Sequence, residues 1–457
     1  MTEGSPTDLD GMRQGERALV INPVLKSERF RATDGALEET IGLARAINLH
    51  VVQALTQPLA QTVSATLFGK GQVQNLAALV AETESLLVIV NHALTPIQQR
   101  NLERDLKAKV IDRTGLILEI FGARARTHEG RLQVELAALS YQKSRLVRSW
   151  THLERQRGGF GFLGGPGESQ LEIDRRLITA RIARLKEELE NVRRTRGLQR
   201  SARSRAGHPT LALVGYTNAG KSTLFNRLTG SEVLAKDMLF ATLDPTMRGI
   251  KLPSGREAIV SDTVGFISDL PTHLVEAFRA TLEEVQLADV ILHVRDIAHP
   301  DTRAQRDSVL EILADLGIRG SDERLIEVQN KIDLLPPEDR MIHADYDARL
   351  TAEAAQTVPL DGLRQEAKGG MIGVSSLTGE GIPQLLNLID QRLAARRQIY
   401  SLTLSVTDGA ALSWLHAHGK IIEQKEARSK INLKVDMEAA DYGRFTRRFL
   451  DLFPKDL

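Results

Sequence analysis

Short apolar runs alternate with amphipathic stretches along the first part of the chain, from residue 17 to residue 121. A run of neighbouring apolar residues predicts a buried strand, and apolar residues three or four apart predict one face of a helix. Because strands that alternate with helices form parallel α/β sheets, we predict such a sheet here. We find no catalytic combination of side chains in this part, so we expect a scaffold or docking domain. The predicted strands are 17–25, 49–55, 85–90 and 109–114, and the predicted helices are 36–47, 71–82 and 95–106.

A coiled-coil spacing of apolar residues replaces this pattern between residues 122 and 206. Apolar residues recur at alternating steps of four and three, with Lys143 in the one slot that breaks the rule, and they resume after a glycine-rich segment. Two such helices with a short connection predict an antiparallel hairpin, with "GGFGFLGGPGES" at its tip. We expect "RSARSRAGHPT", residues 200–210, to end the second helix and act as a linker. The seam residues are Leu132, Leu136, Leu139, Leu146, Trp150 and Leu153, then Ile178, Ile182, Leu185, Leu189 and Val192.

The α/β alternation returns after residue 206, and a shorter mixed pattern fills the tail. In the tail we predict a strand at 399–406, a helix at 409–418, strands at 420–427 and 429–437, and a helix at 440–450. The predicted fold class is therefore α/β, with a helical hairpin and a small α+β unit added. The predicted units are an N-terminal α/β domain (1–121), a hairpin with its linker (122–206), a second α/β domain (207–395) and an α+β domain (396–457).

Composition indicates ordinary soluble globular material with one strongly basic unit. The chain has 457 residues, 42% of them hydrophobic and 26% charged, and it has no cysteine, which excludes disulfides and thiolate metal sites. We find no secretion signal and no apolar run near the roughly 18 residues that span a membrane, so we expect a cytoplasmic protein without stable membrane insertion.

The basic unit is the hairpin region. Residues 122–206 hold 19 Lys/Arg and 9 Asp/Glu, a balance of +10 in a chain whose net charge is +1. Such a block favours a polyanionic partner, and the alternative is a solvated helical surface. The arginines that we expect on its outward faces are Arg145, Arg148, Arg155 and Arg157 in the first helix, and Arg175, Arg176, Arg181 and Arg184 in the second.

A phosphate-binding loop stands at the start of the second α/β unit, in "TLALVGYTNAGKST". Its G-x(4)-G-K-S spacing lies between a predicted strand and a predicted helix, as a phosphate loop requires. Backbone N–H groups and the helix N-terminus would surround the β-phosphate. We expect Lys221 to act as a catalytic group that bridges the β- and γ-phosphates, and the Ser222 hydroxyl to ligate Mg²⁺. The expected nucleotide-binding residues are Gly215, Tyr216, Thr217, Asn218, Ala219, Gly220, Lys221 and Ser222.

Three further motifs follow in an order that indicates a guanine nucleotide. The aspartate of "DTVG" can reach Mg²⁺ directly or through water, and its glycine N–H can sense the γ-phosphate as a second catalytic group. The aspartate of "NKID" can accept from N1 and the 2-amino group of guanine, a donor pair that adenine lacks. The motif "SSL" fits the last base-contacting loop of such proteins. The residues are Asp262, Thr263, Val264 and Gly265; Asn330, Lys331, Ile332 and Asp333; and Ser375, Ser376 and Leu377.

The segment "LFATLDPTMRG", between the first two of these motifs, is expected to be a switch. A threonine in it should cap Mg²⁺ and become ordered when the γ-phosphate binds. Thr242 and Thr246 are both candidates, and turn chemistry beside Pro245 is the alternative role for either. The expected nucleotide contacts of this switch are Phe240, Ala241, Thr242, Leu243 and Asp244.

The chain resembles the HflX family of translation-factor-related GTPases. The resemblance is carried by the glycine-rich "GGFGFLGGPGESQLE" together with "GYTNAGKSTLFN", "FATLDPT", "DTVGFI", "LPTHLVEAFRATLEE" and "NKID". The resemblance covers residues 17–395 and, more weakly, the tail. It implies that Thr242 is the switch ligand of Mg²⁺, and that the protein binds the large ribosomal subunit and splits or rescues stalled ribosomes. Members are also described with ATP binding and RNA unwinding, but the sequence shows no second phosphate loop to support an ATP site.

The position that follows "DTVG" predicts slow hydrolysis by the protein alone. Many GTPases place a glutamine there to orient the attacking water, whereas this chain has Phe266 and then Ile267. An apolar side chain cannot hydrogen-bond a water, so we expect a partner to stimulate hydrolysis by remodelling the switches. Alternatively, Asp269 or His273 supplies the missing group.

The hairpin tip has the composition of a probe for folded RNA. Glycines permit close backbone approach, and Phe160 and Phe162 offer rings for stacking on unpaired bases. We expect phosphate contacts from Arg155, Arg157, Arg175 and Arg176, and the resemblance implies that the RNA is the peptidyl-transferase region of the large subunit. In the alternative, the two phenylalanines pack back on the protein.

Two other functions remain open on the sequence alone. A ribosome-assembly GTPase that acts on immature large subunits would carry the same nucleotide motifs. A signalling or scaffold GTPase, in part peripheral to the membrane, would use the hairpin to bind a protein partner. The excess of arginine and the lack of an amphipathic membrane face count against this last function. We expect a monomer.

Overall fold

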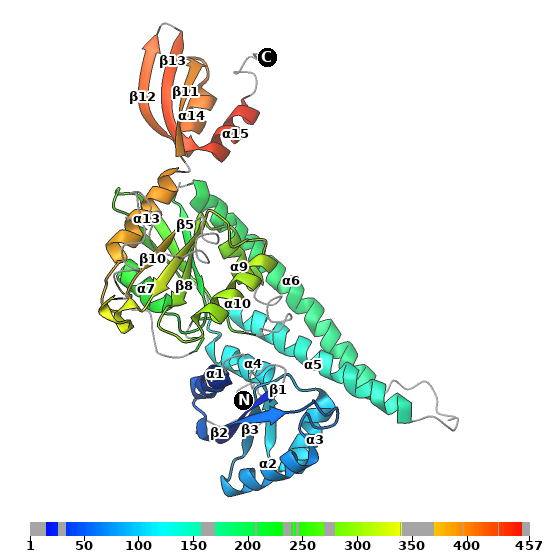
Figure 1. Cartoon of the computed structure of the whole chain (residues 1–457). Helices are drawn as coiled ribbons and strands as arrows, with labels where there is room; N and C mark the ends of the chain where they lie inside the picture. Colours follow the sequence, from blue (N-terminus) through cyan, green and yellow to red (C-terminus); the bar gives the residue numbers. More distant parts are fainter. Residues whose placement is uncertain are drawn as a thin grey trace.

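A computed structural model shows an α/β body with a long helical hairpin and a small terminal module (Figure 1). The N-terminal sheet and the C-terminal module lie at opposite ends of the central domain, and the hairpin projects from the side. Among the described residues, no helix is long and apolar enough to cross a membrane. The structure describes residues 15–25, 33–156, 170–205, 208–231, 239–240, 242–243, 246–268, 279–338, 340, 370–395, 397–427 and 429–449.

The N-terminal domain is the parallel sheet that the sequence predicts, in the strand order β2-β1-β3-β4. The strands at the centre of the sheet are apolar runs covered on both faces, so β3 is buried at every position, whereas the edge strand β2 is only partly buried. The elements are β1 (Arg17–Leu25), α1 (Thr33–Ala46), β2 (His50–Leu59), α2 (Lys70–Glu82), β3 (Leu87–Val90), α3 (Pro96–Leu106), β4 (Lys109–Asp112) and α4 (Arg113–Arg124).

Helix α4 corrects the prediction of a strand over 109–114. The strand ends at Asp112, whose side chain caps the following helix by accepting a hydrogen bond from the Gly115 N–H at 2.8 Å. The apolar sequence after it, which we did not assign to any element, is helical and almost wholly buried. A helix without a polar face lacks the periodicity on which the prediction depended.

The hairpin consists of α5 (His128–Gln156) and α6 (Gln170–Arg205), which pack antiparallel as predicted (Figure 1). Leu185 of α6 is fully buried against Leu132 and Leu136 of α5. The seam residues Leu139, Ile182, Leu189 and Val192 pack around this centre, whereas the side chains of Leu146, Trp150 and Leu153 lie outside the described part.

Two expectations about the hairpin are wrong. Helix α6 continues to Arg205 instead of ending near residue 200, because "RSARSR" contains neither glycine nor proline. Arg145 does not face outward, since its side chain is 18% exposed and is paired within the protein, whereas Arg181 is paired but stays 40% exposed. Arg145 binds Asp112 in the N-terminal domain, and Arg181 makes a two-pronged ion pair with Glu135 of α5.

The central domain has a six-stranded sheet in the order β10-β9-β8-β5-β7-β6, which is parallel except for β6. Its elements are β5 (Thr210–Gly215), α7 (Lys221–Thr229), β6 (Thr246–Lys251), β7 (Glu257–Asp262), α9 (Arg279–Gln286), β8 (Val290–Asp296), α10 (Thr302–Asp315), β9 (Leu325–Asn330), the 3₁₀ turn η2 (Ile332–Leu334), β10 (Met371–Gly373) and α13 (Ile382–Ala395).

The C-terminal module confirms the predicted order of elements. Its antiparallel sheet has the order β11-β13-β12, and two helices cover the face that carries Leu402, Leu433 and Val435. The elements are β11 (Arg397–Ser405), α14 (Gly409–His418), β12 (Lys420–Ala427), β13 (Lys430–Glu438) and α15 (Ala439–Arg448).

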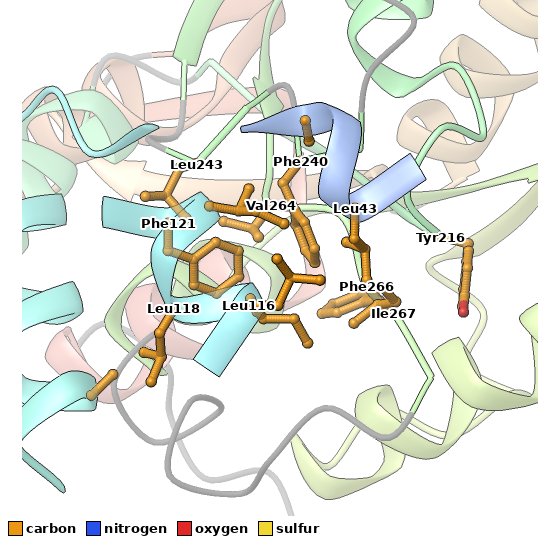
Figure 2. Close-up of a cluster of buried hydrophobic side chains, with 14 of the residues drawn as sticks. Leu43, Leu116, Leu118, Phe121, Tyr216, Phe240, Leu243, Val264, Phe266 and Ile267 are labelled. Atoms are coloured by element: carbon orange, nitrogen blue, oxygen red, sulfur yellow. The ribbon is translucent and has the colours of Figure 1, made fainter. Parts of the chain in front are cut away.

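One hydrophobic core joins the N-terminal domain to the central domain (Figure 2). Leu43 of α1 and Phe121 of α4 lie in the same cluster as Phe240, Val264 and the apolar residues behind the central sheet. The rings of Phe121 and Phe240 meet edge to face, with their centroids 4.8 Å apart. The N-terminal domain is therefore packed directly on the expected switch segment and on the second switch, the "DTVG" motif, a contact that the sequence did not predict.

Candidate nucleotide site

The four nucleotide motifs meet at the carboxyl ends of the central parallel strands. The register pairs Leu213 of β5 with Asp262 of β7, and Asp296 of β8 with Asn330 of β9. Each motif begins where its strand ends, so motifs that are more than a hundred residues apart come together at one edge. This edge is where parallel α/β sheets bind their ligands.

The phosphate loop passes directly into α7, which begins at Lys221. Gly220 has φ +91°, and a Cβ at this position would lie 2.2 Å from Asn330 Nδ2, so only glycine fits. The Lys221 ammonium is buried and donates a hydrogen bond to the Tyr216 carbonyl at 2.7 Å. Burial lowers the pKa of Lys221 to about 8, although the nearby Asp262 carboxylate acts in the opposite direction.

Three oxygen atoms converge beside this loop. Ser222 Oγ lies 2.9 Å from Thr242 Oγ1 and 2.8 Å from Asp262 Oδ2, and Thr242 Oγ1 lies 2.9 Å from the same carboxylate oxygen. Burial raises the pKa of Asp262, while Lys221 and the two hydroxyls lower it. Thr246 instead begins β6, opposite Asp262 in the register. The geometry therefore favours Thr242 over Thr246 as the switch threonine.

The same three oxygens fit a magnesium ion. Mg²⁺ prefers hard oxygen ligands and usually takes one or two from a carboxylate or hydroxyl, with the rest from phosphates and water. The second carboxylate oxygen of Asp262, Oδ1, is buried and has no hydrogen-bond partner among the described residues. Within that part of the chain no cluster of three or more His, Asp or Glu forms a metal site of another kind.

Asn330 ties the phosphate loop to both base-contacting motifs. Its Nδ2 donates to the Ala219 carbonyl at 2.8 Å, and its Oδ1 accepts from the N–H and the hydroxyl of Ser376 at 3.0 and 2.8 Å. Lys331 has φ +66° and forms an ion pair with Asp296 at 2.7 Å. Asp333 follows in η2 and is half-buried. Its carboxyl group is the one that we predict to recognise guanine.

Several predicted contact residues have side chains that are buried or hydrogen-bonded elsewhere, and one is mainly exposed to solvent. The side chains of Phe240 and Leu243 are buried in the core shared with the N-terminal domain, so only their main chain remains for a nucleotide. Thr263 donates its hydroxyl hydrogen to the Leu213 carbonyl at 2.6 Å, and Leu377 is 72% exposed. Val264 and Ile332 are also buried. Ala241 and Asp244 lie outside the described residues.

Gly265 lies close to the phosphate loop. A Cβ there would come within 2.9 Å of Thr217 Cγ2 and 3.1 Å of Lys221 Nζ. The next residue, Phe266, is buried, and its main chain donates to Gly215 and accepts from Thr217, at 3.0 and 2.7 Å. Phe266 therefore holds the switch against the loop with its backbone, while its ring belongs to the core (Figure 2). Asp269 and His273, the alternative water-orienting groups, lie outside the described residues.

The predicted RNA contacts are only in part described. Arg175 and Arg176 lie exposed on α6. Arg157, Phe160 and Phe162 fall outside the described residues, as does the side chain of Arg155. The prediction that the tip is a probe for RNA therefore stays a prediction.

Sequence reasoning missed a set of polar residues from the N-terminal domain that reach the nucleotide motifs. Glu39 of α1 accepts a hydrogen bond from the Tyr216 hydroxyl in the phosphate loop. Arg113 of α4 donates to the carbonyl of Ser268, just after the "DTVG" switch, at 3.0 Å. A spacing signal could not have revealed them, because their partners are 177 and 155 positions away.

Four family models match successive parts of the chain. They are described as "GTP-binding GTPase N-terminal" (residues 34–122), "GTP-binding GTPase Middle Region" (124–203), "50S ribosome-binding GTPase" (210–331) and "HflX C-terminal domain" (363–455).

Curated relatives match nearly the whole chain. The chain is 49% identical to the GTPase HflX of Magnetococcus marinus over 94% of either chain. It is 40% identical to the GTPase HflX of Escherichia coli, over 95% of this chain and 96% of that protein. A crystal structure of a GTP-binding protein from Sulfolobus solfataricus, in complex with GDP, is 25% identical with a TM-score of 0.42, over 82% of this chain and 98% of that chain.

Proposed function

The chain belongs to the HflX family of GTPases, and we propose that it binds the large ribosomal subunit in its GTP state and dissociates or rescues stalled ribosomes in the cytoplasm. The observation that carries this proposal is the hairpin. Its exposed helix α6 carries Arg175 and Arg176, and further along it forms an ion pair from Arg193 to Glu283 of α9, which follows the "DTVG" switch in the sequence. A basic, projecting element is thus attached to the central domain that carries the nucleotide motifs.

The site residues have distinct roles in the proposed hydrolysis. Lys221 and the backbone of the phosphate loop hold the β- and γ-phosphates, and the Gly265 N–H contacts the γ-phosphate. Ser222 and Thr242 would hold Mg²⁺, with Asp262 beside them. The ion supplies neutralisation of the charge on the phosphate oxygens.

Guanine recognition is assigned to the loops joined by Asn330. Asp333 accepts from N1 and the 2-amino group of the base. Asn330 holds the Ser376 loop beside it by accepting two hydrogen bonds from Ser376. The remaining predicted contacts of this region, Lys331 and Ser375, line the same edge.

We propose that the free protein hydrolyses GTP slowly, and the burial of Phe266 supports this proposal. Phe266 is 2% exposed and its side chain belongs to the core shared with the N-terminal domain, so the ring is not available to orient an attacking water. We propose that ribosome binding remodels the switches and thereby stimulates turnover. The basic hairpin would bind ribosomal RNA through its phosphates, in keeping with the description of the matched central family model as a 50S ribosome-binding GTPase.

Co-sedimentation with purified ribosomes and separated subunits tests this proposal. We expect binding to large subunits that is stronger with a non-hydrolysable GTP analogue than with GDP, together with faster GTP turnover when large subunits are present. Release of subunits from intact ribosomes identifies a splitting factor. The absence of binding and of stimulation with either nucleotide would overturn the ribosomal function.

The test also separates the alternatives. A preference for immature large subunits over mature ones, without splitting of ribosomes, would identify an assembly GTPase. A chain that ignores all ribosomal particles but retains GTP turnover would be a GTPase with a protein or membrane partner. The sedimentation of the free chain reports whether it is a monomer, as we propose.

A further inference from the structure

Two consecutive residues at the end of β4 face different parts of the molecule. Asp112 ends the strand and contacts the hairpin, and Arg113 begins α4 and contacts the nucleotide motifs. Both side chains are buried, at 2% and 7% exposure. Because they are adjacent in the chain, neither contact can shift far without the other.

Asp112 is the anchor of helix α5 on the N-terminal sheet. Its Oδ1 accepts from the Tyr141 hydroxyl at 2.7 Å, and its Oδ2 accepts from Arg145 at 3.3 Å. The backbone N–H groups of Leu94 and Gly115 complete its contacts at 3.1 and 2.8 Å. A buried carboxylate with four donors fixes the base of the hairpin more rigidly than apolar packing alone would.

Arg113 connects the N-terminal domain to the end of the "DTVG" switch and, through Glu39, to the phosphate loop. Its guanidinium donates to Glu39 at 2.7 Å and to the Ser268 carbonyl at 3.0 Å, while Asn91 accepts a third bond at 2.7 Å. Glu39 also accepts from the hydroxyl of Tyr216 in the phosphate loop.

The hydroxyl of Tyr216 closes this network. It accepts a hydrogen bond from the Ser268 N–H at 2.9 Å and lies 2.7 Å from the Ser268 hydroxyl. The end of the "DTVG" switch is thus bonded to the phosphate loop and to the N-terminal domain at once.

We propose that Asp112 and Arg113 couple the hairpin to the switch, so that a ligand that displaces α5 repositions Ser268 and Tyr216 and thereby changes the rate of GTP hydrolysis. The inference rests on the proposed function, because it supplies the route by which large subunits stimulate turnover. Asp112 and Arg113 act as positioning residues, since neither touches the nucleotide motifs' phosphate-binding atoms. We propose that the same route couples the binding free energies of the two sites, and because such coupling is reciprocal, the bound nucleotide should also alter the base of α5.

GTP turnover of the full chain, with and without purified large subunits, tests the route. We expect Tyr141→Phe, which removes one hydrogen bond to Asp112, to keep the basal rate and subunit binding but to reduce the stimulation by about threefold or more. Arg113→Lys keeps the charge but replaces the two guanidinium nitrogens that make these bonds with a single ammonium nitrogen, so it should reduce the stimulation further.

The matched control is Tyr400→Phe, which removes a tyrosine hydrogen bond to Gln398 in the C-terminal module, away from this route. It should be stimulated like the parent chain. Full stimulation of Tyr141→Phe and Arg113→Lys, with normal subunit binding, would overturn the coupling.

Amide hydrogen exchange over residues 136–145 of α5, compared between GDP and a non-hydrolysable GTP analogue, separates this inference from the ribosomal function. We expect a nucleotide-dependent difference in the parent chain that is lost in Arg113→Lys. Identical exchange in the parent with both nucleotides would overturn the coupling. A clear difference in a chain that large subunits do not stimulate would support the coupling and reject the ribosomal function.

Discussion

The contact of Thr242 with Ser222 and Asp262 distinguishes two neighbouring threonines. Thr242 Oγ1 lies within 2.9 Å of both partner oxygens, whereas Thr246 is in a strand pair with Asp262. We expect Thr242→Ala to lower GTP turnover roughly 10- to 100-fold and to raise the Mg²⁺ concentration needed for half-maximal rate, because a metal contact is lost. Thr246→Ala, measured in the same magnesium titration, should stay close to the parent chain. Equal losses in both variants would contradict the assignment.

Asp333 is the residue on which base specificity should depend. An asparagine offers one donor and one acceptor where the carboxylate offers two acceptors, so the 2-amino group of guanine loses its partner. We expect Asp333→Asn to weaken GDP binding by roughly 100-fold or more, and to improve binding of xanthosine diphosphate, whose 2-oxo group accepts a hydrogen bond. Fluorescence titration with both nucleotides measures the two effects. Asp315→Asn, on the exposed end of α10, is the control that should change neither affinity.

Motif residues could be predicted from the sequence, while their supports from the N-terminal domain could not. The spacing of glycine, lysine and serine in a phosphate loop is fixed by a local chain path, so a stretch of eight residues, 215–222, identifies it. Glu39 reaches Tyr216 only because two domains pack together, and this contact joins residues 177 positions apart. Phe240 likewise belongs to a motif by its position and to the core by its side chain.

Elements with clear periodicity were predicted well, and the misses have local causes. The strands and amphipathic helices of the N-terminal domain match the structure because each has one apolar period. Helix α4 lacks a polar face, and α6 extends past residue 200 through a polar, arginine-rich stretch that has no apolar seam. The exposed arginines of the hairpin were over-counted by Arg145, because its side chain pairs with a carboxylate that lies 33 positions away.

The exposed arginines of α6 should determine how binding to RNA depends on salt. Each phosphate contact that is lost lowers the slope of log affinity against log salt by roughly one unit. We expect the pair Arg175→Ala and Arg176→Ala to weaken binding to large subunits and to flatten this slope by up to about two units. Sedimentation over a range of potassium chloride concentrations gives both numbers.

A variant of equal charge change controls for the net charge of the chain. Arg303→Ala with Arg319→Ala removes two exposed arginines from the central domain, outside the hairpin. An unchanged slope in the hairpin variant, or the same flattening in this control, would argue against phosphate contacts from α6.

At the scale of the whole molecule, the two α/β domains share a core. The N-terminal sheet buries Val20 and Ile89 toward the central domain, and its opposite face buries Ile21 and Val90 in a separate cluster. Phe240 takes part in the shared core with φ +54°, a left-handed conformation that costs about 1–3 kcal/mol for a residue other than glycine. The burial of its ring against Phe121 offsets that cost, so the N-terminal domain holds this switch in place.

The opposite faces of the N-terminal sheet therefore provide a matched pair of substitutions, each of which removes part of a buried phenylalanine ring. Phe121 lies in the shared core beside Phe240, and Phe68 is fully buried in the separate cluster. We expect Phe121→Leu and Phe68→Leu each to lower the free energy of unfolding by roughly 1–2 kcal/mol. Only Phe121→Leu should also lower GTP turnover, by roughly tenfold, because it releases the support of a switch whose Thr242 follows two residues after Phe240. Urea denaturation and steady-state turnover of folded protein measure the two effects, and equal turnover in the two variants would show that the switch does not depend on the shared core.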